Sequence, residues 1–221
     1  MTDTTERVPT EPGTKWVRGY SNGRKVVDTR AVQLVWTHPY YPTWLFPAAD
    51  VDDDFAAREA TAITNHDDLP DHVSIRWDAI DHWFEEDVEV FVHARDPHKR
   101  VDALASSRHV RVSIDGTVIA DTHKPTILFE TGLPSRYYLP PTDVRLDLLT
   151  PSDTTTGCPY KGFASYWTAT IDGTEHPDIV WSYPTPLPES EAVGGLMCFY
   201  NEKVDIEIDD VAQERPKTQF S

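Results

Sequence analysis

Residues 26–51 read V-V-D-T-R-A-V-Q-L-V-W-T-H-P-Y-Y-P-T-W-L-F-P-A-A-D-V, and residues 119–144 read I-A-D-T-H-K-P-T-I-L-F-E-T-G-L-P-S-R-Y-Y-L-P-P-T-D-V. The two stretches align without a gap at a constant shift of 93 residues. Self-similarity at a fixed shift is the signature of an internal duplication. We therefore expect two related units. Their predicted bounds are 14–104 and 105–210, with a disordered N-terminal tail at 1–13 and a C-terminal tail at 211–221.

The similarity resumes further along the chain. Residues 75–77, Ile-Arg-Trp, match residues 179–181, Ile-Val-Trp, at a shift of 104, and residues 100–102 match residues 203–205 at a shift of 103. On this alignment the second unit carries 11 more residues between its matching parts. The extra length falls around T-G-C-P-Y-K-G-F-A-S-Y-W, residues 156–167, which has no counterpart in the first unit.

Both units have the pattern of β-sheet proteins. Asn-Gly at 22–23 and Asp-Gly at 115–116 lie between strand-like runs, which is the strongest short-range signal for a hairpin. Helix is expected only at 53–63 and 189–194. We predict a mainly β fold made of two duplicated small β domains, either β-tent-like or a short-strand sandwich or barrel, with one or two short helices.

The charge of the chain excludes several classes of function. A formal net charge of −17 repels phosphate backbones and anionic membrane surfaces, so neither nucleic acid nor a membrane is an expected partner. The 24 aspartates against 7 lysines favour a halophile-type surface over a specific cationic partner. The N-terminal residues lack a signal-peptide pattern, and two cysteines are too few for a disulfide framework. We expect a cytoplasmic protein.

The second unit carries charged residues that the first unit lacks. Glu130 is predicted at the end of a strand and Arg136 just after a turn, so that a hairpin would bring them together. The aligned residues of the first unit are Thr37 and Thr43. A residue that the fold requires would recur in both units, so this asymmetry points to a site in the second. The alternative is a surface ion pair worth less than about 1 kcal/mol.

Cys158 is the candidate nucleophile of the second unit. A nearby cation favours the reactive thiolate, and Lys161 or Arg136 could supply that charge. Lys161 could also bind a carboxylate or phosphate itself. The alternative is a buried thiol that only fills space. The chain lacks C-x-x-C, H-E-x-x-H, P-loop and G-x-G-x-x-G motifs, so we expect neither a metal nor a cofactor.

Aromatic side chains form a further candidate surface in the second unit. Stacked rings with a few polar groups make a small-molecule pocket, although rings in β proteins more often fill the core. Alternation along the strand places Arg136 and Tyr138 on one face and Tyr137 on the other. The candidate ligand-binding residues are Arg136, Tyr137, Tyr138, Tyr160, Tyr166 and Trp181.

These motifs resemble a known family. R-Y-Y-L-P-x-x-D-V at 136–144, C-P-Y-K-G-x-A-x-Y-W at 158–167, W-S-Y at 181–183 and F-Y at 199–200 are similar to the domain of unknown function 427. The first unit resembles the same domain without the Cys-Pro-Tyr-Lys-Gly segment, so the chain resembles a tandem member. The resemblance implies a small, mostly β domain of the β-tent type. The family carries a nucleotidyltransferase label, but the paired metal-binding acids of that chemistry are missing here.

The sequence thus predicts one small-molecule site in the second unit. Cys158, Lys161 and Glu130 are its candidate catalytic residues, for acyl-type or hydrolytic chemistry without a cofactor on a small anionic or carbonyl substrate. Glu130 would orient Arg136 or act as a general base. The rival hypothesis is a binding module with an aromatic cage and no turnover. A third is that the first unit only braces the second.

Overall fold

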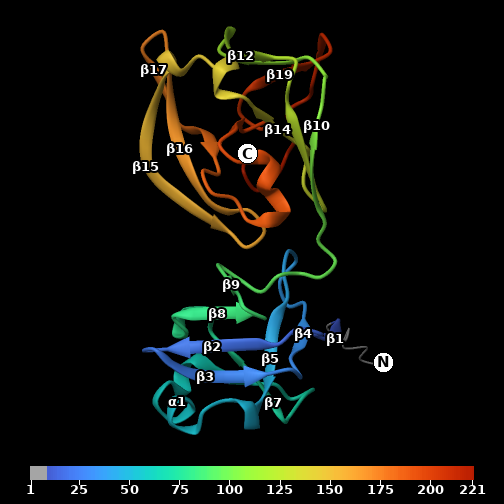
Figure 1. Cartoon of the computed structure of the whole chain (residues 1–221), viewed down its shortest axis with the longest axis vertical. Coiled ribbons are helices and arrows are strands. Elements are labelled where there is room, and N and C mark those ends of the chain that lie inside the picture. Colours follow the sequence, from blue (N-terminus) through green and yellow to red (C-terminus); the bar gives the residue numbers. More distant parts are fainter. Residues whose placement is uncertain (1–8) are drawn as a thin grey trace, which may run out of the picture. The chain divides into compact units, whose positions relative to one another are not determined.

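The computed structural model describes residues 9–221, which divide between Asp96 and Pro97 into two compact units (Figure 1). The predicted boundary lay eight residues later, at 104/105. The difference arises because residues 101–105 form a strand that pairs with the second unit rather than with the first. The predicted tail at 1–13 is partly structured, since residues 10–12 form a strand, while residues 1–8 lie outside the described part of the chain.

The first unit contains two antiparallel sheets, with strand orders β1-β4-β5-β7-β6 and β3-β2-β8-β9. Their bounds are β1 (Thr10–Pro12), β2 (Val17–Ser21), β3 (Arg24–Thr29), β4 (Gln33–Val35), β5 (Thr43–Pro47), β6 (Ile63–Asn65), β7 (His72–Ile75), β8 (His82–Glu85) and β9 (Val88–Val90). The core between the sheets includes Val17 from one sheet and Phe46 from the other, both almost fully buried. In β2, for example, every second residue is buried, as the two-residue period of a strand predicts.

The helical segments of the first unit are short: α1 (Asp53–Arg58), η1 (Ala48–Asp50), η2 (Ala60–Ala62) and η3 (Trp77–Ala79). The helix predicted at 53–63 therefore ends early and continues as the 3-10 turn η2. The Asp52 side chain caps α1 by accepting a hydrogen bond of 2.8 Å from the Phe55 amide. Phe55 is fully buried and fixes the helix on the core.

The second unit also has two antiparallel sheets, ordered β10-β13-β14-β18-β17-β16-β15 and β12-β11-β19-β20. The strands are β10 (Val101–Ala105), β11 (Val110–Ile114), β12 (Thr117–Thr122), β13 (Thr126–Glu130), β14 (Arg136–Leu139), β15 (Leu149–Cys158), β16 (Gly162–Ile171), β17 (Thr174–Ser182), β18 (Met197–Phe199), β19 (Asp205–Ile208) and β20 (Val211–Ala212). The 3-10 segments are η4 (Pro141–Asp143), η5 (Leu146–Leu148) and η6 (Pro188–Val193). The helix predicted at 189–194 is η6.

The central strands β14 and β18 of the seven-stranded sheet in the second unit are covered on both faces, whereas the edge strand β15 is largely exposed. One face packs on the four-stranded sheet and contributes Leu139 and Phe199 to a shared core. The other face carries a second cluster that includes Leu128, Tyr138 and Cys198, together with Val193 from η6. Because both faces of β14 and β18 are buried, a polar side chain on either face must find a partner inside the protein.

The two units share their strand pairing residue by residue. Leu34 pairs with Trp44 in the first unit, and Ile127 pairs with Tyr137 in the second, at the shift of 93 seen in the sequence. The pairs β1–β4 and β10–β13 keep the same shift, as do the hairpins β2–β3 and β11–β12, including the position of their bulge. The sequence alignment of residues 26–51 with 119–144 is thus matched by equal register.

The later part of the sequence alignment was wrong. Leu45 pairs with Ser74, and its counterpart Tyr138 pairs with Cys198, so β7 corresponds to β18 at a shift of 124. The matches of 75–77 with 179–181 and of 100–102 with 203–205 therefore do not hold. The shift between corresponding residues of the two units therefore grows from 93 to 124, which is 31 residues and not the 11 residues of the sequence alignment. Most of this length forms the hairpin of β15 and β16 and the first part of β17, which curve along one side of the unit (Figure 1).

The mainly β fold class is confirmed, with short helical segments only. The paired sheets fit the short-strand sandwich among the expected architectures, and the sheets described within 9–221 do not close into a barrel. Between residues 9 and 221, no helix has the length and apolar character that a membrane span needs.

A truncation at Leu139 tests the shared core of the second unit. Leu139 is fully buried, so Leu139→Ala removes apolar contacts and leaves a cavity, which should lower the free energy of unfolding by about 2–5 kcal/mol. Leu146→Ala, at a half-exposed side chain of the same unit, should change it by no more than about 0.5 kcal/mol. Equal effects of the two variants in urea unfolding would contradict this account of the core.

Candidate functional site

The Cys-Pro-Tyr-Lys-Gly segment is a tight turn between two long strands. Cys158 ends β15 and pairs with Gly162, the first residue of β16. Gly162 has a φ of +93°, and a Cβ atom there would lie 3.2 Å from the Thr185 carbonyl oxygen. The Leu187 amide donates to the Lys161 carbonyl at 3.2 Å. The segment before η6 therefore holds the turn, and glycine is required at its last position.

Lys161 extends from this turn to Glu130 at the end of β13. The two side chains form an ion pair and are only 11% and 10% exposed. Burial lowers the pKa of Lys161, but the neighbouring Cys158 and Glu130 side chains outweigh burial through their charges and hydrogen bonds and raise it. Lys161 is thus held as an ammonium group. It can bind an anion or polarise a carbonyl, but it is not a free amine nucleophile.

The two cysteines lie in different environments, and both are free thiols. Cys158 is partly buried beside Lys161 and packs at the border of the aromatic cluster. Cys198 is fully buried in β18, and burial raises the pKa of its thiol. Of the two thiols, Cys158 alone combines partial exposure with an adjacent cation, which are the conditions for a reactive cysteine.

Arg136 pairs with Glu202 rather than with Glu130, so the predicted Glu130–Arg136 contact was wrong. The guanidinium donates two hydrogen bonds to the Glu202 carboxylate, at 2.7 and 2.8 Å, and the side chains are 8% and 0% exposed. Arg136 lies on the same strand face as Tyr138, whereas Glu130 is engaged by Lys161. No sequence pattern indicated the real partner, because Glu202 is 66 residues away and belongs to the turn after β18.

The predicted C-terminal tail covers this second ion pair. Thr218 donates a hydrogen bond of 2.6 Å to Glu202, and the Phe220 ring lies 5.7 Å from the Arg136 guanidinium and 6.1 Å from the Tyr200 ring. Residues 211–212 form β20. Residues 211–221 are therefore part of the second unit, and Thr218 and Phe220 cover the Arg136–Glu202 ion pair.

The aromatic side chains pack between the two ion pairs. The Trp181 indole donates to the Tyr138 hydroxyl at 3.1 Å, and its ring lies 4.6 Å from Tyr200. The Arg136 guanidinium lies 5.7 Å from the Trp181 ring centroid. Burial raises the pKa of Tyr138 well above its ordinary value, so that it stays a neutral phenol. Trp181 is enclosed by these neighbours, and its faces do not form an open aromatic cage.

The structure brings together most of the predicted residues. Cys158, Lys161 and Glu130 are adjacent, and the cluster of Tyr138, Tyr166 and Trp181 lies beside them. Tyr160 is buried within the turn itself. Tyr137 lies on the opposite face of β14, against the other core, as alternation predicted. Tyr183, whose pKa burial raises, is a further buried member of the cluster, and Glu202 and Thr218 complete the Arg136 pair.

A metal centre is not evident in the part of the chain that the structure describes. Within residues 9–221, histidine, cysteine and acidic side chains do not gather in groups of three or more that could hold an ion. The polar groups of the cluster are instead two cations, two carboxylates, two thiols and several phenols. Such a set can bind an anionic or carbonyl group and supply a nucleophile.

These features define a two-unit β protein whose second unit holds a buried charge cluster, made of the pairs Arg136–Glu202 and Lys161–Glu130. Residues 102–210 match the family described as Domain of unknown function (DUF427), whose model is labelled NTP_transf_9. The match covers the second unit from β10 to the turn after β19, and through it the second unit belongs to this family. A comparison with the curated proteins found no match for the chain.

Breaking the Arg136–Glu202 pair should destabilise the protein in a pH-dependent way. Glu202→Gln leaves a buried guanidinium without its counter-charge, which should cost about 3–5 kcal/mol of unfolding free energy at neutral pH. Burial raises the pKa of Glu202, but hydrogen bonds from Arg136 and Thr218 outweigh it and hold the pKa below its ordinary value. The contribution of the Glu202 carboxylate to the free energy of unfolding is therefore fully present above about pH 4.3, the pKa of glutamate in the unfolded chain. It is lost as the pH falls through the lower pKa of Glu202 in the folded protein.

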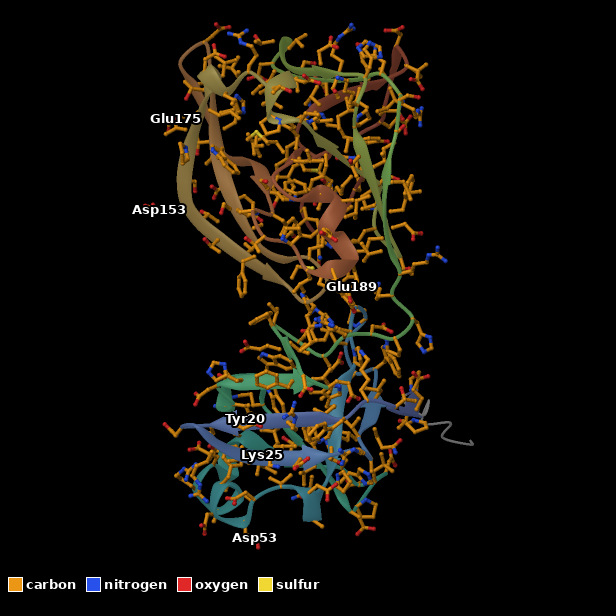
Figure 2. The ribbon with its side chains drawn as sticks, viewed as in Figure 1. Tyr20, Lys25, Asp53, Asp153, Glu175 and Glu189 are labelled. Carbon is orange, nitrogen blue, oxygen red and sulfur yellow. The ribbon has the colours of Figure 1, made fainter. Side chains whose placement is uncertain are left out.

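Urea unfolding between pH 7 and pH 3 measures this effect. The difference between the wild type and Glu202→Gln should shrink as the pH approaches 3. The matched control is Glu175→Gln, at an exposed carboxylate on the outer side of the β16–β17 hairpin (Figure 2), which should behave as the wild type at each pH. If the difference in unfolding free energy between the wild type and Glu202→Gln stayed constant with pH, the Arg136–Glu202 ion pair would not be the cause of that difference.

Proposed function

We propose that the second unit binds a small anionic or carbonyl compound at Cys158, Lys161 and Glu130, and that it is an enzyme for acyl-type or hydrolytic chemistry that needs no cofactor. One observation carries the proposal. Two nearly buried ion pairs, a thiol and several phenols border the same aromatic cluster on one face of one sheet.

The energetics of these ion pairs favour a functional role. Removing two charges from water costs several kcal/mol, and well-packed apolar residues often stabilise a core as well or better. The first unit has the same strand register, yet it carries Thr37 and Thr43 where the second has Glu130 and Arg136. The fold can therefore be built without the charges, which supports their retention for binding or catalysis.

We propose a role for each of the three residues. Lys161 binds the carboxylate or carbonyl oxygen of the substrate through its ammonium group. The Cys158 sulfur forms a bond to the carbonyl carbon, the bond to the leaving group breaks, and Glu130 transfers the thiol proton to the leaving group. Water then attacks the thioester, which releases the acid and restores the thiol. An aromatic cage in this unit is not part of the proposal, because Tyr138, Tyr200 and Arg136 surround Trp181.

We also infer that the chain is a tandem duplication whose second unit gained the β15–β16 hairpin. The common register of three strand pairings supports this inference. The cytoplasm is the proposed location, since the two cysteines are free thiols and a reducing compartment keeps them so. The excess of acidic residues supports a surface adapted to high salt.

Acylation by 4-nitrophenyl acetate tests the proposed nucleophile. The native protein should gain one acetyl group, which peptide mass spectrometry should locate on Cys158, and Cys158→Ser should remove it. Lys161→Met should slow acylation at least about 10-fold, because the cation that polarises the carbonyl is lost. Lys124→Met, at an exposed lysine of the same unit, is the matched control and should acylate at the wild-type rate.

Two outcomes would overturn the proposal. One is acylation of Cys158 only after unfolding in urea. The other is equal acylation rates for Lys161→Met and Lys124→Met, with both variants showing wild-type circular dichroism. Either result would assign Cys158 and the Lys161–Glu130 pair to packing alone.

A further inference from the structure

The first unit contains a hollow of about 360 Å³ whose walls come from six of its segments. Trp44 and Phe46 of β5 form one wall, and Trp77 of η3 and Trp83 of β8 form another. Residues 41–43 and 92–94 lie at its edge, and Thr61 and Thr64 add hydroxyl groups. All lining residues lie between 41 and 94, so the hollow belongs to the first unit alone. Its volume lies at the lower end of the range for small-molecule sites.

The aromatic walls are held rigidly. Trp83 stacks on Phe46 with ring centroids 5.4 Å apart and planes 7° apart, and Trp44 meets Trp83 edge to face at 5.4 Å. The Trp83 indole donates to the Trp77 carbonyl at 3.2 Å. A Cβ atom on Gly19 would lie 2.8 Å from the Trp83 ring, so glycine is what lets the ring pack there. The rings are thus pre-organised, which lowers the entropic cost of binding a ligand.

Trp44 supplies an unused hydrogen-bond donor in this wall. Its side chain is only 4% exposed, and among the described residues no hydrogen bond from its indole N–H is found. The nitrogen is not one of the fully buried atoms that lack a partner, so it keeps some access to solvent. Buried indole N–H groups usually find an acceptor, and Trp83 in the same cluster does so. An unpaired donor in the wall of a hollow is the position at which the acceptor of a ligand would bind.

The second unit has a hollow at the equivalent place, with different chemistry. It measures about 170 Å³ and is lined by Tyr137, Asn201 and Ile206 among others. Tyr137 corresponds to Trp44 through the shift of 93, and Ile206 pairs opposite Val112 as Trp83 pairs opposite Gly19. The fold therefore forms a hollow at this corner without tryptophan. The hollow of the first unit is larger than that of the second and is lined with indole rings. Packing of the fold alone does not require these rings, because the second unit lacks them at this place.

We propose that this hollow is a second binding site, and that its ligand is a planar heteroaromatic molecule with a hydrogen-bond acceptor and no positive charge. Trp rings also attract organic cations, but the hollow has no acidic residue in its lining, and Arg76, which does line it, is paired with Asp78. A flat ring packs against Trp77, the tryptophan of the lining that is only partly buried, and the acceptor receives the Trp44 N–H. This site is separate from Cys158 and Lys161, and its failure would leave the function proposed for the second unit untouched.

Two probes of equal size distinguish the ligand classes. Quinolin-2-one is neutral and has a carbonyl acceptor, whereas N-methylquinolinium is a cation without one. In titrations of the full chain followed by the indole N–H resonances in ¹H–¹⁵N spectra, quinolin-2-one should move the Trp44 resonance downfield and bind at least about 10-fold more tightly than N-methylquinolinium. Trp44→Phe keeps a ring in the wall but removes the donor, and should weaken binding of quinolin-2-one about 10-fold.

The matched control is Trp16→Phe, because the Trp16 indole N–H already donates to Asp28 at 2.6 Å and does not line the hollow. That variant should bind quinolin-2-one as the wild type does. Three results would overturn the proposal: a Trp44 resonance that does not move at millimolar quinolin-2-one, equal affinities for Trp44→Phe and Trp16→Phe, or binding of the cation as tight as that of the neutral probe. The wild-type titration decides the question even if Trp44→Phe fails to fold.

Discussion

Four consecutive residues of β14 point alternately to the two faces of one sheet, and the organisation of the second unit depends on this alternation. Tyr137 and Leu139 face the core shared with the four-stranded sheet, whereas Arg136 and Tyr138 face the aromatic cluster under η6. Both faces are covered, so the guanidinium of Arg136 cannot reach bulk water. A buried guanidinium needs a carboxylate, and Glu202 fulfils that need with two hydrogen bonds.

The same constraint explains the second ion pair. Lys161 is placed by a turn whose backbone is held by Gly162 and by the Leu187 amide, and its side chain is buried. Glu130 at the end of β13 supplies the opposite charge. The two ion pairs restrict the side-chain conformations of the aromatic residues that pack between them. This rigidity is what a binding or catalytic site requires, because the groups that meet a substrate are already in place.

The two units show how one strand framework can carry different chemistry. Their pairings agree from β1 to β5 and from β10 to β14, and then the second unit inserts the long β15–β16 hairpin where the first has α1. The end of β17 takes the place beside β18 that β6 takes beside β7. The insertion brings Cys158 and Lys161 to the face that already holds Glu130 and Arg136. The first unit lacks these residues and carries an aromatic hollow at another corner of the same framework. The two units thus place different side chains on a shared strand framework.

The sequence alone determined the β class, the constant shift of 93, both hairpin turns and the face on which Arg136 and Tyr138 lie. These features follow from turn residues and from the two-residue period of a strand, which are local properties. Only the tertiary structure decided that Arg136 pairs with Glu202, that Lys161 pairs with Glu130, that β7 corresponds to β18, and that Trp44 and Trp83 border one hollow. Those facts depend on contacts between residues far apart in the chain. Their geometry is set by how sheets pack, and a pattern of neighbouring residues carries no record of it.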